Sequence, residues 1–252
     1  IGGSPIKWVG LQNYIKTLTS VKFWNSMLNA LYFVIGGFVI LMPIAFGLAL
    51  LVTSKLKGTK FFKAAYLMPV MLGTTAVGLM WSFMLNANFG VLAQFLKAIG
   101  HSEWIINWLA TPTVNIWCVV LVNEWMYAGY NMLIFAAGIV AIPDDVHEAA
   151  LLDGCTGIKK IIYIQLPLLM PTITINLFVS IAGAFKAFDI PLSLTGGGPA
   201  NSTQTIALNI YNDAFGSFKM GYGSAKSIIL FLLVGIIALI QLKITRKREV
   251  QM

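Results

Sequence analysis

Residues 147–171 have the sequence HEAALLDGCTGIKKIIYIQLPLLMP and differ in character from the rest of the chain. Within fourteen residues the stretch carries Glu148, Asp153, two lysines and two glycines, and it becomes apolar again around Pro167. Long apolar runs precede and follow it, over about 112–138 and 168–192. A short charged segment between two such runs is typical of a loop that joins two membrane-spanning helices.

The composition of the whole chain agrees with a lipid environment. Of its 252 residues, 58% are hydrophobic and only 10% are charged, and the mean hydropathy is +0.81. A soluble domain carries about 25% charged residues, so a water-soluble fold would have too much apolar surface to bury. The net charge of +8 would also suit a nucleic-acid-binding protein. However, the lysines and arginines lie at the ends of apolar runs, where membrane proteins place them.

Five apolar runs are long enough to cross a bilayer, which takes about 20 residues in a helix. They cover 27–53, 64–85, 112–138, 168–192 and 225–243. We therefore predict an all-α, polytopic transmembrane helical bundle. We expect residues 1–252 to form one transmembrane domain, with 143–167 as a loop within it.

The distribution of basic residues predicts the orientation. With five alternating spans and a cytoplasmic C-terminus, ten lysines and arginines lie inside and six lie outside, Lys226 among the latter. Basic residues favour the cytoplasmic side, so residues 147–166 are predicted to be cytoplasmic. The N-terminus is then outside without a visible signal peptide, and we expect one further helix before Ile1, which makes six in all.

Two segments predicted to lie outside mix aromatic, apolar and lysine residues. They are 6–24, with the sequence IKWVGLQNYIKTLTSVKFW, and 89–108, with the sequence FGVLAQFLKAIGHSEWIINW. This pattern suits helices that lie in the membrane interface. A partly buried extracellular loop is the alternative for each.

The charged segment itself predicts a helix–turn–helix. Asp144 and Asp145 follow Pro143, and acidic residues favour the first turn of a helix. Gly154 either ends that helix or lets another backbone approach closely. A second short helix is indicated by the helical spacing of Ile158, Ile161, Ile162 and Leu166. The segment is long for a connector, which favours a docking surface. His147 is predicted to be a solvated loop residue.

The same residues resemble a known motif. Glu148-Ala149-Ala150, Asp153-Gly154, Ile164, Leu166-Pro167 and Pro171 resemble the EAA motif of ABC-importer permeases. Cys155 is the one departure, at a position where a small residue such as alanine is usual. Three further stretches are similar to the carbohydrate-uptake branch, the subunit type related to the maltose and glycerol-phosphate permeases. They are VGLQNY (9–14), AGYNMLIFAAGIVAIPDDVHEAA (128–150) and FDIPLSLTGGGPANSTQTIALNIYNDAF (188–215).

The resemblance implies a type I ABC-importer permease whose loop is a coupling helix, seated in a groove of a cytoplasmic ATPase subunit. It assigns that contact to Glu148, Ala149, Ala150, Asp153, Gly154 and Pro167. The implied function is import of a sugar or oligosaccharide by alternating access across a bacterial plasma membrane. The implied partners are a second, non-identical permease, two ATPase subunits and an extracytoplasmic solute-binding protein.

This chain is not expected to be an enzyme or to bind a cofactor itself. It contains no Gly-Lys dipeptide, so it has no phosphate-binding loop of the Walker A type. ATP and Mg²⁺ are expected on the partner ATPase subunits. The two cysteines and two histidines form neither a disulfide framework nor a spacing typical of metal ligands.

Polar residues inside the apolar runs are candidates for a substrate path. An acid in mid-membrane costs about 2.5–3.5 kcal/mol on insertion scales, so Glu124 should face a cavity or a partner. Helical spacing predicts one polar stripe of Glu124, Tyr127 and Asn131, and a second of Asn176, Ser180 and Ala184. Together they would line a path for a hydroxyl-rich substrate. The alternative is that these polar groups only tie helices together.

Two further features lie close to the predicted outer face. Lys186 and Asp189 are three residues apart and are predicted to form an ion pair. A role for Lys186 toward an anionic substrate is the alternative. Residues 195–199 (TGGGP) are predicted to form a flexible turn that shapes the outer mouth, contacts the binding protein or is a plain loop.

Other functions remain open at this stage. The first alternative is an ABC importer of glycerol-phosphate or another small polar solute. The second is a secondary transporter or channel that works alone, for which the spans offer few coupling residues apart from Glu124. A membrane protein with only an interaction role is the third.

Overall fold

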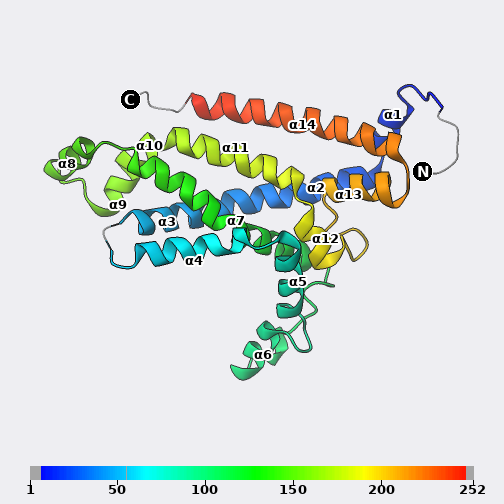
Figure 1. Ribbon diagram of the computed structural model, residues 1–252, viewed down its shortest axis with the longest axis horizontal. Helices are drawn as coiled ribbons and strands as arrows, with labels where there is room; N and C mark the ends of the chain where they lie inside the picture. The colour runs from blue at the N-terminus through cyan, green and yellow to red at the C-terminus, as the bar shows by residue number, and fades with distance from the viewer. Residues whose placement is uncertain (1–6, 55, 248–252) are drawn as a thin grey trace. The chain divides into compact units, whose positions relative to one another are not determined.

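A computed structural model describes residues 7–54 and 56–247. Within these ranges the chain is helical, with connecting turns and no strand, which confirms the all-α prediction (Figure 1). The predicted helix before Ile1 and the charges counted at Lys55 and Arg248 lie outside the described residues.

Among the residues that the structure describes, two helical runs are long and apolar enough to cross a membrane. One covers Val21–Thr53 and consists of α2 (Val21–Gly36), a π-helical turn η1 (Gly37–Leu41) and α3 (Met42–Thr53). The other is α14 (Met220–Arg246). Three further pairs are bent by more than 40° at a short break. They are α4 (Thr59–Met71) with α5 (Thr74–Met84), α7 (Val114–Val140) with α8 (Asp144–Leu152), and Gly157–Leu168 with α11 (Met170–Lys186). If each pair crosses once, the described residues supply up to five spans, the number predicted.

Several predicted boundaries differ from the structure, and the first helical run begins at Val21 rather than 27. The span predicted over 64–85 is interrupted at Leu72 and Gly73. The one predicted over 168–192 ends at Lys186, because Phe188 leaves the helical conformation (φ −134°, ψ −56°) before α12 (Asp189–Thr195) begins. The fifth helix begins at Met220 rather than 225, which places Lys226 in its second turn rather than at its start.

The break at Phe188 also changes the expected pairing of Lys186. Since Lys186 and Asp189 belong to different helices, they do not have the one-turn spacing that the pairing assumed. The ion pairs found among the described residues are His101–Glu103 and Lys226–Asp213. The predicted Lys186–Asp189 pair is therefore wrong.

Contacts divide the chain into two units, which are described separately. The first unit contains Ile1–Ile35, Leu72–Asn123 and Gly183–Gly235, and the second contains Gly36–Met71, Glu124–Ala182 and Ile236–Met252. Several helices contribute residues to both units, α7 and α14 among them.

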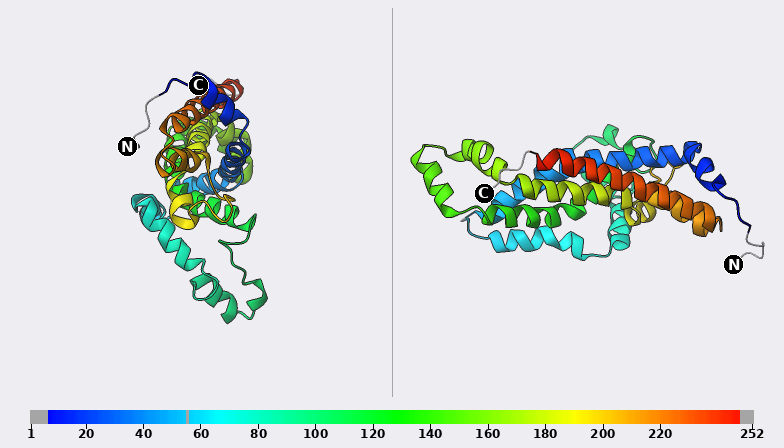
Figure 2. Two further views of the ribbon diagram at one scale, coloured as in Figure 1. Left: turned by 90° about the vertical axis from the view of Figure 1, so that its right-hand side faces the viewer. Right: turned by 90° about the horizontal axis from the view of Figure 1, so that it is seen from above.

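In the first unit, α12 packs against α5 (Figure 1). The contact is very close at Gly78, where an added Cβ would lie 1.8 Å from Ser193 Oγ. The remaining short elements of this unit are α1 (Gln12–Leu18), α6 (Val91–Ala98), η2 (Ser102–Trp104), α13 (Ile206–Tyr211) and η4 (Asn212–Gly216). Figure 2 shows α6 following α5 away from the other helices of this unit. Its residues Val91 and Phe95 are exposed, as are Leu11 and Ile15 around α1. The interfacial placement of these helices stays a prediction.

The second unit has an apolar core built mainly by α3 and α7. Its buried residues are Met42, Ala45, Ala49, Met132, Phe135, Ala136, Ile139, Ile142 and Leu169. Two glycines of α7 allow neighbouring helices to come close. A Cβ on Gly129 would lie 1.9 Å from the carbonyl oxygen of Tyr66 on α4, and one on Gly138 would lie 2.3 Å from Thr172 Oγ1 on α11. Figure 1 shows α4 running beside this part of α7.

Candidate functional site

The charged segment forms two short helical runs after α7, as the sequence predicts. The first is α8, which begins after Pro143 with Asp144 and Asp145 in its first turn. The second consists of α9 (Gly157–Lys160), a π-helical turn η3 (Ile161–Gln165) and α10 (Leu166–Leu168). Figure 1 shows α8 and α9 beyond the ends of α7 and α11. Residues 143–167 are called the coupling segment below.

Gly154 ends α8 through its backbone conformation. Its φ is +69°, in the left-handed region. Its N–H donates to Leu151 O at 3.1 Å, and the N–H of Cys155 donates to Ala150 O at 2.8 Å. These two bonds form a Schellman motif, for which glycine is preferred because it has no Cβ. A Cβ on Gly154 would meet no other atom of the chain within 4 Å. Of the two roles predicted for Gly154, ending the helix is the one that appears within this chain.

The two faces of α8 differ. Asp145, Glu148 and Leu152 lie at i, i+3 and i+7 and are exposed, with Leu152 at 89%. On the other face, Val146 packs against the core of the second unit and Ala150 is only 2% exposed.

The residues assigned to the ATPase contact therefore differ in how exposed they are in this chain. Glu148, Ala149, Asp153 and Gly154 are exposed, Ala150 faces this chain, and Pro167 is half-buried. Their roles in coupling stay predictions.

The second run leaves three of its apolar residues exposed in this chain, and the others are half-buried. Ile158, Ile162 and Tyr163 are exposed, whereas Gln165 is buried. A turn at Leu169 then bends the chain by 72° into α11. In α8, His147 is half-buried, and its Nδ1 is buried without a hydrogen-bond partner in the described part of the chain. The prediction of a solvated His147 is wrong, because the side chain turns toward the protein.

The two predicted polar stripes meet within the second unit. Ser180 Oγ on α11 donates to Asn131 Oδ1 on α7 at 3.5 Å, and Asn131 Nδ2 donates to Tyr127 O at 3.0 Å. Gly37 of η1 lies against Ser180, since its added Cβ would be 3.6 Å from Ser180 Cβ. Two residues that sequence spacing selected on separate spans therefore lie in contact in the structure.

The other members of the stripes are mostly buried. Asn176 is fully buried, and neither its Oδ1 nor its Nδ2 has a hydrogen-bond partner among the described residues. Glu124 is 4% exposed and Tyr127 is half-buried. Ala184 is buried on the part of α11 that belongs to the first unit. Burying an amide without a hydrogen-bond partner costs free energy. A polar group from outside this chain, such as a ligand hydroxyl, would therefore stabilise the Asn176 side chain.

The sequence analysis missed a buried charged cluster in the first unit. Lys226 is 1% exposed, and its Nζ donates to Asp213 Oδ2 and Asn209 Oδ1 and lies 4.5 Å from the centre of the Tyr222 ring. Lys226 was counted as an outer charge at a helix end. The available signal was Asp213, the one acidic residue between Asp189 and Glu249 in the sequence.

The turn at 195–199 is more firmly held than the sequence predicts. Thr203 Oγ1 donates to Gly198 O at 3.1 Å and is hydrogen-bonded to Thr195 Oγ1 at 2.6 Å. Asn115 Nδ2 donates to Gly198 O at 3.3 Å and to Ser202 Oγ at 2.6 Å. Side chains on both sides of this turn therefore fix its backbone.

Comparison with known proteins identifies the family. Residues 61–250 match the binding-protein-dependent transport system inner membrane components. The chain belongs to this family. The match confirms the resemblance to ABC-importer permeases and identifies the chain as a membrane component of a transport system.

Curated permeases are similar to this chain over nearly its whole length. The probable starch degradation products transport system permease AmyD of Thermoanaerobacterium thermosulfurigenes is 36% identical over 245 residues, which are 97% of this chain and 82% of AmyD. The trehalose/maltose transport system permease MalF of Thermococcus litoralis is 34% identical over 96% of this chain and 81% of its own. The sn-glycerol-3-phosphate transport system permease UgpA of Agrobacterium fabrum is 32% identical over 98% and 83%.

A solved structure confirms the permease fold. A chain of a bacterial ABC transporter for import of the acidic polysaccharide alginate matches with a TM-score of 0.85 at 22% identity, over 95% of this chain and 84% of that chain. The transmembrane, type I permease fold predicted from the sequence is therefore confirmed.

Proposed function

We propose that this permease is the transmembrane subunit of an ATP-driven importer that moves a sugar or oligosaccharide into the cell by alternating access. The names of its relatives support this cargo, since AmyD serves starch degradation products and MalF serves trehalose and maltose. The coupling segment supports the energy source. It presents an acid, a small residue and an apolar residue on one exposed face of a short helix outside the core.

The exposed face of α8 is the observation that carries the proposal. Leu152 is 89% exposed and Leu151 is 58% exposed, beside Glu148 and Ala149. Exposed leucines next to an acid and a small residue suit a partially apolar groove on another protein. In the proposed complex this groove belongs to an ATPase subunit, and its rigid-body motion passes through the coupling segment into α7 and α11.

The proposed complex contains a second, non-identical permease, two ATPase subunits and an extracytoplasmic solute-binding protein. ATP and Mg²⁺ bind to the ATPase subunits, and this chain contributes no catalytic residue. The basic residues favour a C-terminus and a coupling segment on the cytoplasmic side, and the proposed location is the plasma membrane of a bacterial cell. The polar cluster of Tyr127, Asn131, Asn176 and Ser180 is the proposed path for a hydroxyl-rich substrate.

Reconstitution tests this function. The complex is purified through a tag on this chain, placed in proteoliposomes with its binding protein, and supplied with radiolabelled maltose, trehalose or sn-glycerol 3-phosphate. We expect uptake of a neutral sugar that requires ATP and persists when ion gradients are collapsed.

Each rival gives a different result in the same assay. Exclusive uptake of sn-glycerol 3-phosphate would favour glycerol-phosphate as the cargo, the alternative that the similarity to UgpA supports. Uptake driven by a proton or sodium gradient without ATP would favour a secondary transporter and would contradict the proposal.

A further inference from the structure

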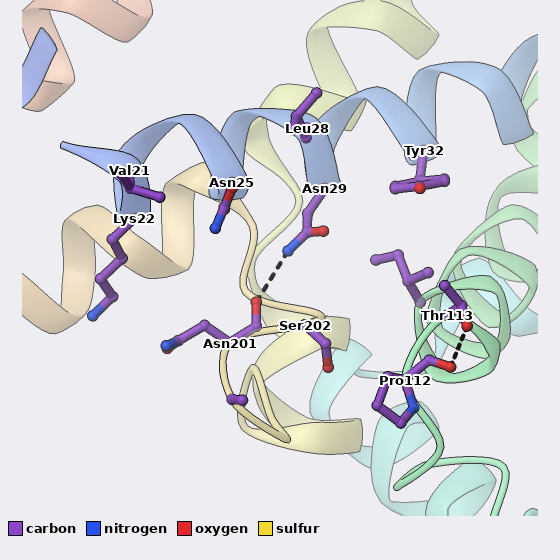
Figure 3. Close-up of a pocket in the computed structure, with 12 residues that line it drawn as sticks. Val21, Lys22, Asn25, Leu28, Asn29, Tyr32, Pro112, Thr113, Asn201 and Ser202 are labelled. Atoms are coloured by element: carbon purple, nitrogen blue, oxygen red, sulfur yellow. Dashed lines mark hydrogen bonds between the residues drawn. The ribbon is translucent and has the colours of Figure 1, made fainter. Parts of the chain in front are cut away.

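A second polar site lies in the first unit, separate in sequence from the residues of the proposed path. It is a pocket of about 530 Å³ lined by the start of α2, residues 112–116 and the loop 200–202 (Figure 3). Pockets of roughly 300–1,000 Å³ hold small-molecule ligands. All of its lining residues belong to the first unit.

One face of α2 supplies much of the polar lining. Asn25, Asn29 and Tyr32 lie at i, i+4 and i+7, so they project from the same side of the helix (Figure 3). Asn25 is exposed, and its side chain has no hydrogen-bond partner in the described chain. Tyr32 is half-buried and is held by an edge-to-face contact with Trp117, with ring centres 5.5 Å apart.

The loop 200–202 forms the wall opposite α2, and hydrogen bonds hold it in place. The side chains that make these bonds keep further polar groups available to a ligand. Asn29 Nδ2 donates to Asn201 O and to Gln204 O, each at 3.1 Å, and its Oδ1 points away from Asn201 (Figure 3). Ser202 Oγ accepts a hydrogen bond from Asn115, so its own proton remains free to donate. Asn29 itself is 9% exposed. The wall is therefore positioned before any ligand arrives.

The buried cluster around Lys226 is connected by hydrogen bonds to the wall of the pocket. Asn209 accepts a hydrogen bond from Lys226 and donates to Gln204 Oε1 at 3.0 Å, and Gln204 O in turn accepts from Asn29. A continuous set of buried polar contacts thus leads from α14 to the pocket wall.

The backbone around the pocket adopts several left-handed conformations. Among the described residues, four that are not glycine have positive φ, and three of these line the pocket: Thr113 (+67°), Ala200 (+49°) and Asn201 (+65°). Such conformations are disfavoured for L-residues and concentrate at binding and catalytic sites. Their presence on two separate segments that face one pocket points to a ligand.

The lining chemistry indicates the class of ligand. Three amides, three hydroxyl groups and one aromatic ring line the pocket, with no carboxylate and only Lys22 as a charged group. Amides and hydroxyls both donate and accept hydrogen bonds, which suits a ligand that carries several hydroxyl groups. The ring offers an apolar surface. We propose that this pocket is a saccharide subsite that binds one neutral sugar ring of the cargo, which rests on the proposed sugar import.

Direct binding to the purified complex tests the subsite. Radiolabelled maltose is titrated against the nanodisc-embedded complex in the absence of the binding protein, for wild type, Asn25→Ala, Tyr32→Leu and Asn88→Ala. Asn25 is exposed and unpaired, so its replacement should not disturb folding. Asn88 is an exposed asparagine of the same unit that does not line the pocket, and it is the matched control.

We expect saturable maltose binding that is weakened about five- to tenfold by Asn25→Ala and by Tyr32→Leu, and unchanged by Asn88→Ala. Equal affinity in all four proteins, or no saturable binding to wild type, would overturn the subsite. Displacement of maltose by sn-glycerol 3-phosphate at lower concentration than by trehalose would also overturn it, because the ligand would then be anionic.

The outcome for the subsite is separate from that for the proposed function. Failure of wild-type proteoliposomes to take up any sugar with ATP overturns sugar import, whatever the titration shows. Normal ATP-driven sugar uptake with identical maltose affinity in the pocket variants overturns the subsite alone.

Discussion

Gly129 on α7 and Tyr66 on α4 approach so closely that a methyl group on Gly129 would lie 1.9 Å from the Tyr66 carbonyl oxygen. The obstacle is a backbone atom of another helix, so it cannot rotate away as a side chain could. The close packing of these two helices therefore depends on the absence of one Cβ.

Replacement of Gly129 by alanine should destabilise the permease. We expect Gly129→Ala to cost at least the 1–3 kcal/mol or so that is typical of an overpacked core and to lower the apparent melting temperature of the detergent-solubilised complex. Gly183→Ala is the control, because a Cβ there meets nothing within 4 Å. Equal melting curves for the two variants would contradict the close contact.

The end of α8 should be sensitive to residues that avoid positive φ. Gly154→Ala forces a Cβ into the left-handed region at a cost of about 1–2 kcal/mol, whereas Gly154→Asn should be tolerated better. We expect ATP-driven sugar uptake to fall more with alanine than with asparagine. Gly47→Ala, at a position with free space and no positive φ, should retain wild-type uptake.

Glu148 should be required for association with the ATPase subunits. Removal of an exposed acid from the proposed contact should lower the amount of ATPase that copurifies with Glu148→Ala, without a change in melting temperature. Glu103→Ala serves as the comparison, since Glu103 is also an exposed acid but lies in η2. If both variants retain the same amount of ATPase, the docking assignment is wrong.

The buried pair of Lys226 and Asp213 should be costly to break from one side. We expect Lys226→Met to destabilise the protein by about 3–5 kcal/mol, because a partly buried carboxylate loses its counter-charge. The double variant Lys226→Met/Asp213→Asn should recover part of that loss. Chemical unfolding followed by tryptophan fluorescence measures each step, with Lys219→Met, at an exposed site, as the control. A double variant no more stable than Lys226→Met would contradict the buried pair.

Replacement of Asn176 should affect sugar uptake without lowering the stability of the protein. Both of its buried polar atoms lack partners among the described residues, so Asn176→Leu should leave the melting temperature unchanged or raised. If the amide serves the substrate path, the same variant should lower sugar uptake several-fold. Normal uptake by a well-folded Asn176→Leu would remove Asn176 from the path.

The sequence predicted those features that depend on local composition. The length of an apolar run identifies a candidate span, whatever the order of the apolar residues within it. The charges and glycines of residues 147–160 mark a loop between two such runs. Helical spacing placed Asn131 and Ser180 on the polar stripes of two separate spans, and the structure brings these two residues into contact. The helix break at Phe188 was missed although Pro191 was a signal for it, because in a continuous helix the Pro191 ring would clash with the carbonyl group of Ala187.

The pocket of the first unit was not predictable in this way. Asn29 and Gln204 are 175 residues apart in sequence and are joined by one hydrogen bond. Thr113, Ala200 and Asn201 adopt positive φ although two of them are of types that rarely do so. Lys226 looked like an ordinary charge at a helix end until the fold placed Asp213 and Asn209 around it.

The π-helical turn η1 has a consequence for chain length. Such a turn accommodates one residue more than an α-helical turn, and each residue of an α-helix rotates the chain by about 100°. Deletion of a single residue between Gly37 and Leu41 would restore a regular helix and leave the facing of α3 about unchanged, whereas winding all five residues as an α-helix would turn α3 by about that angle. Ala45 and Ala49, both fully buried, would then leave the core of the second unit. A one-residue insertion, kept within a single turn, sets which side of α3 faces α7.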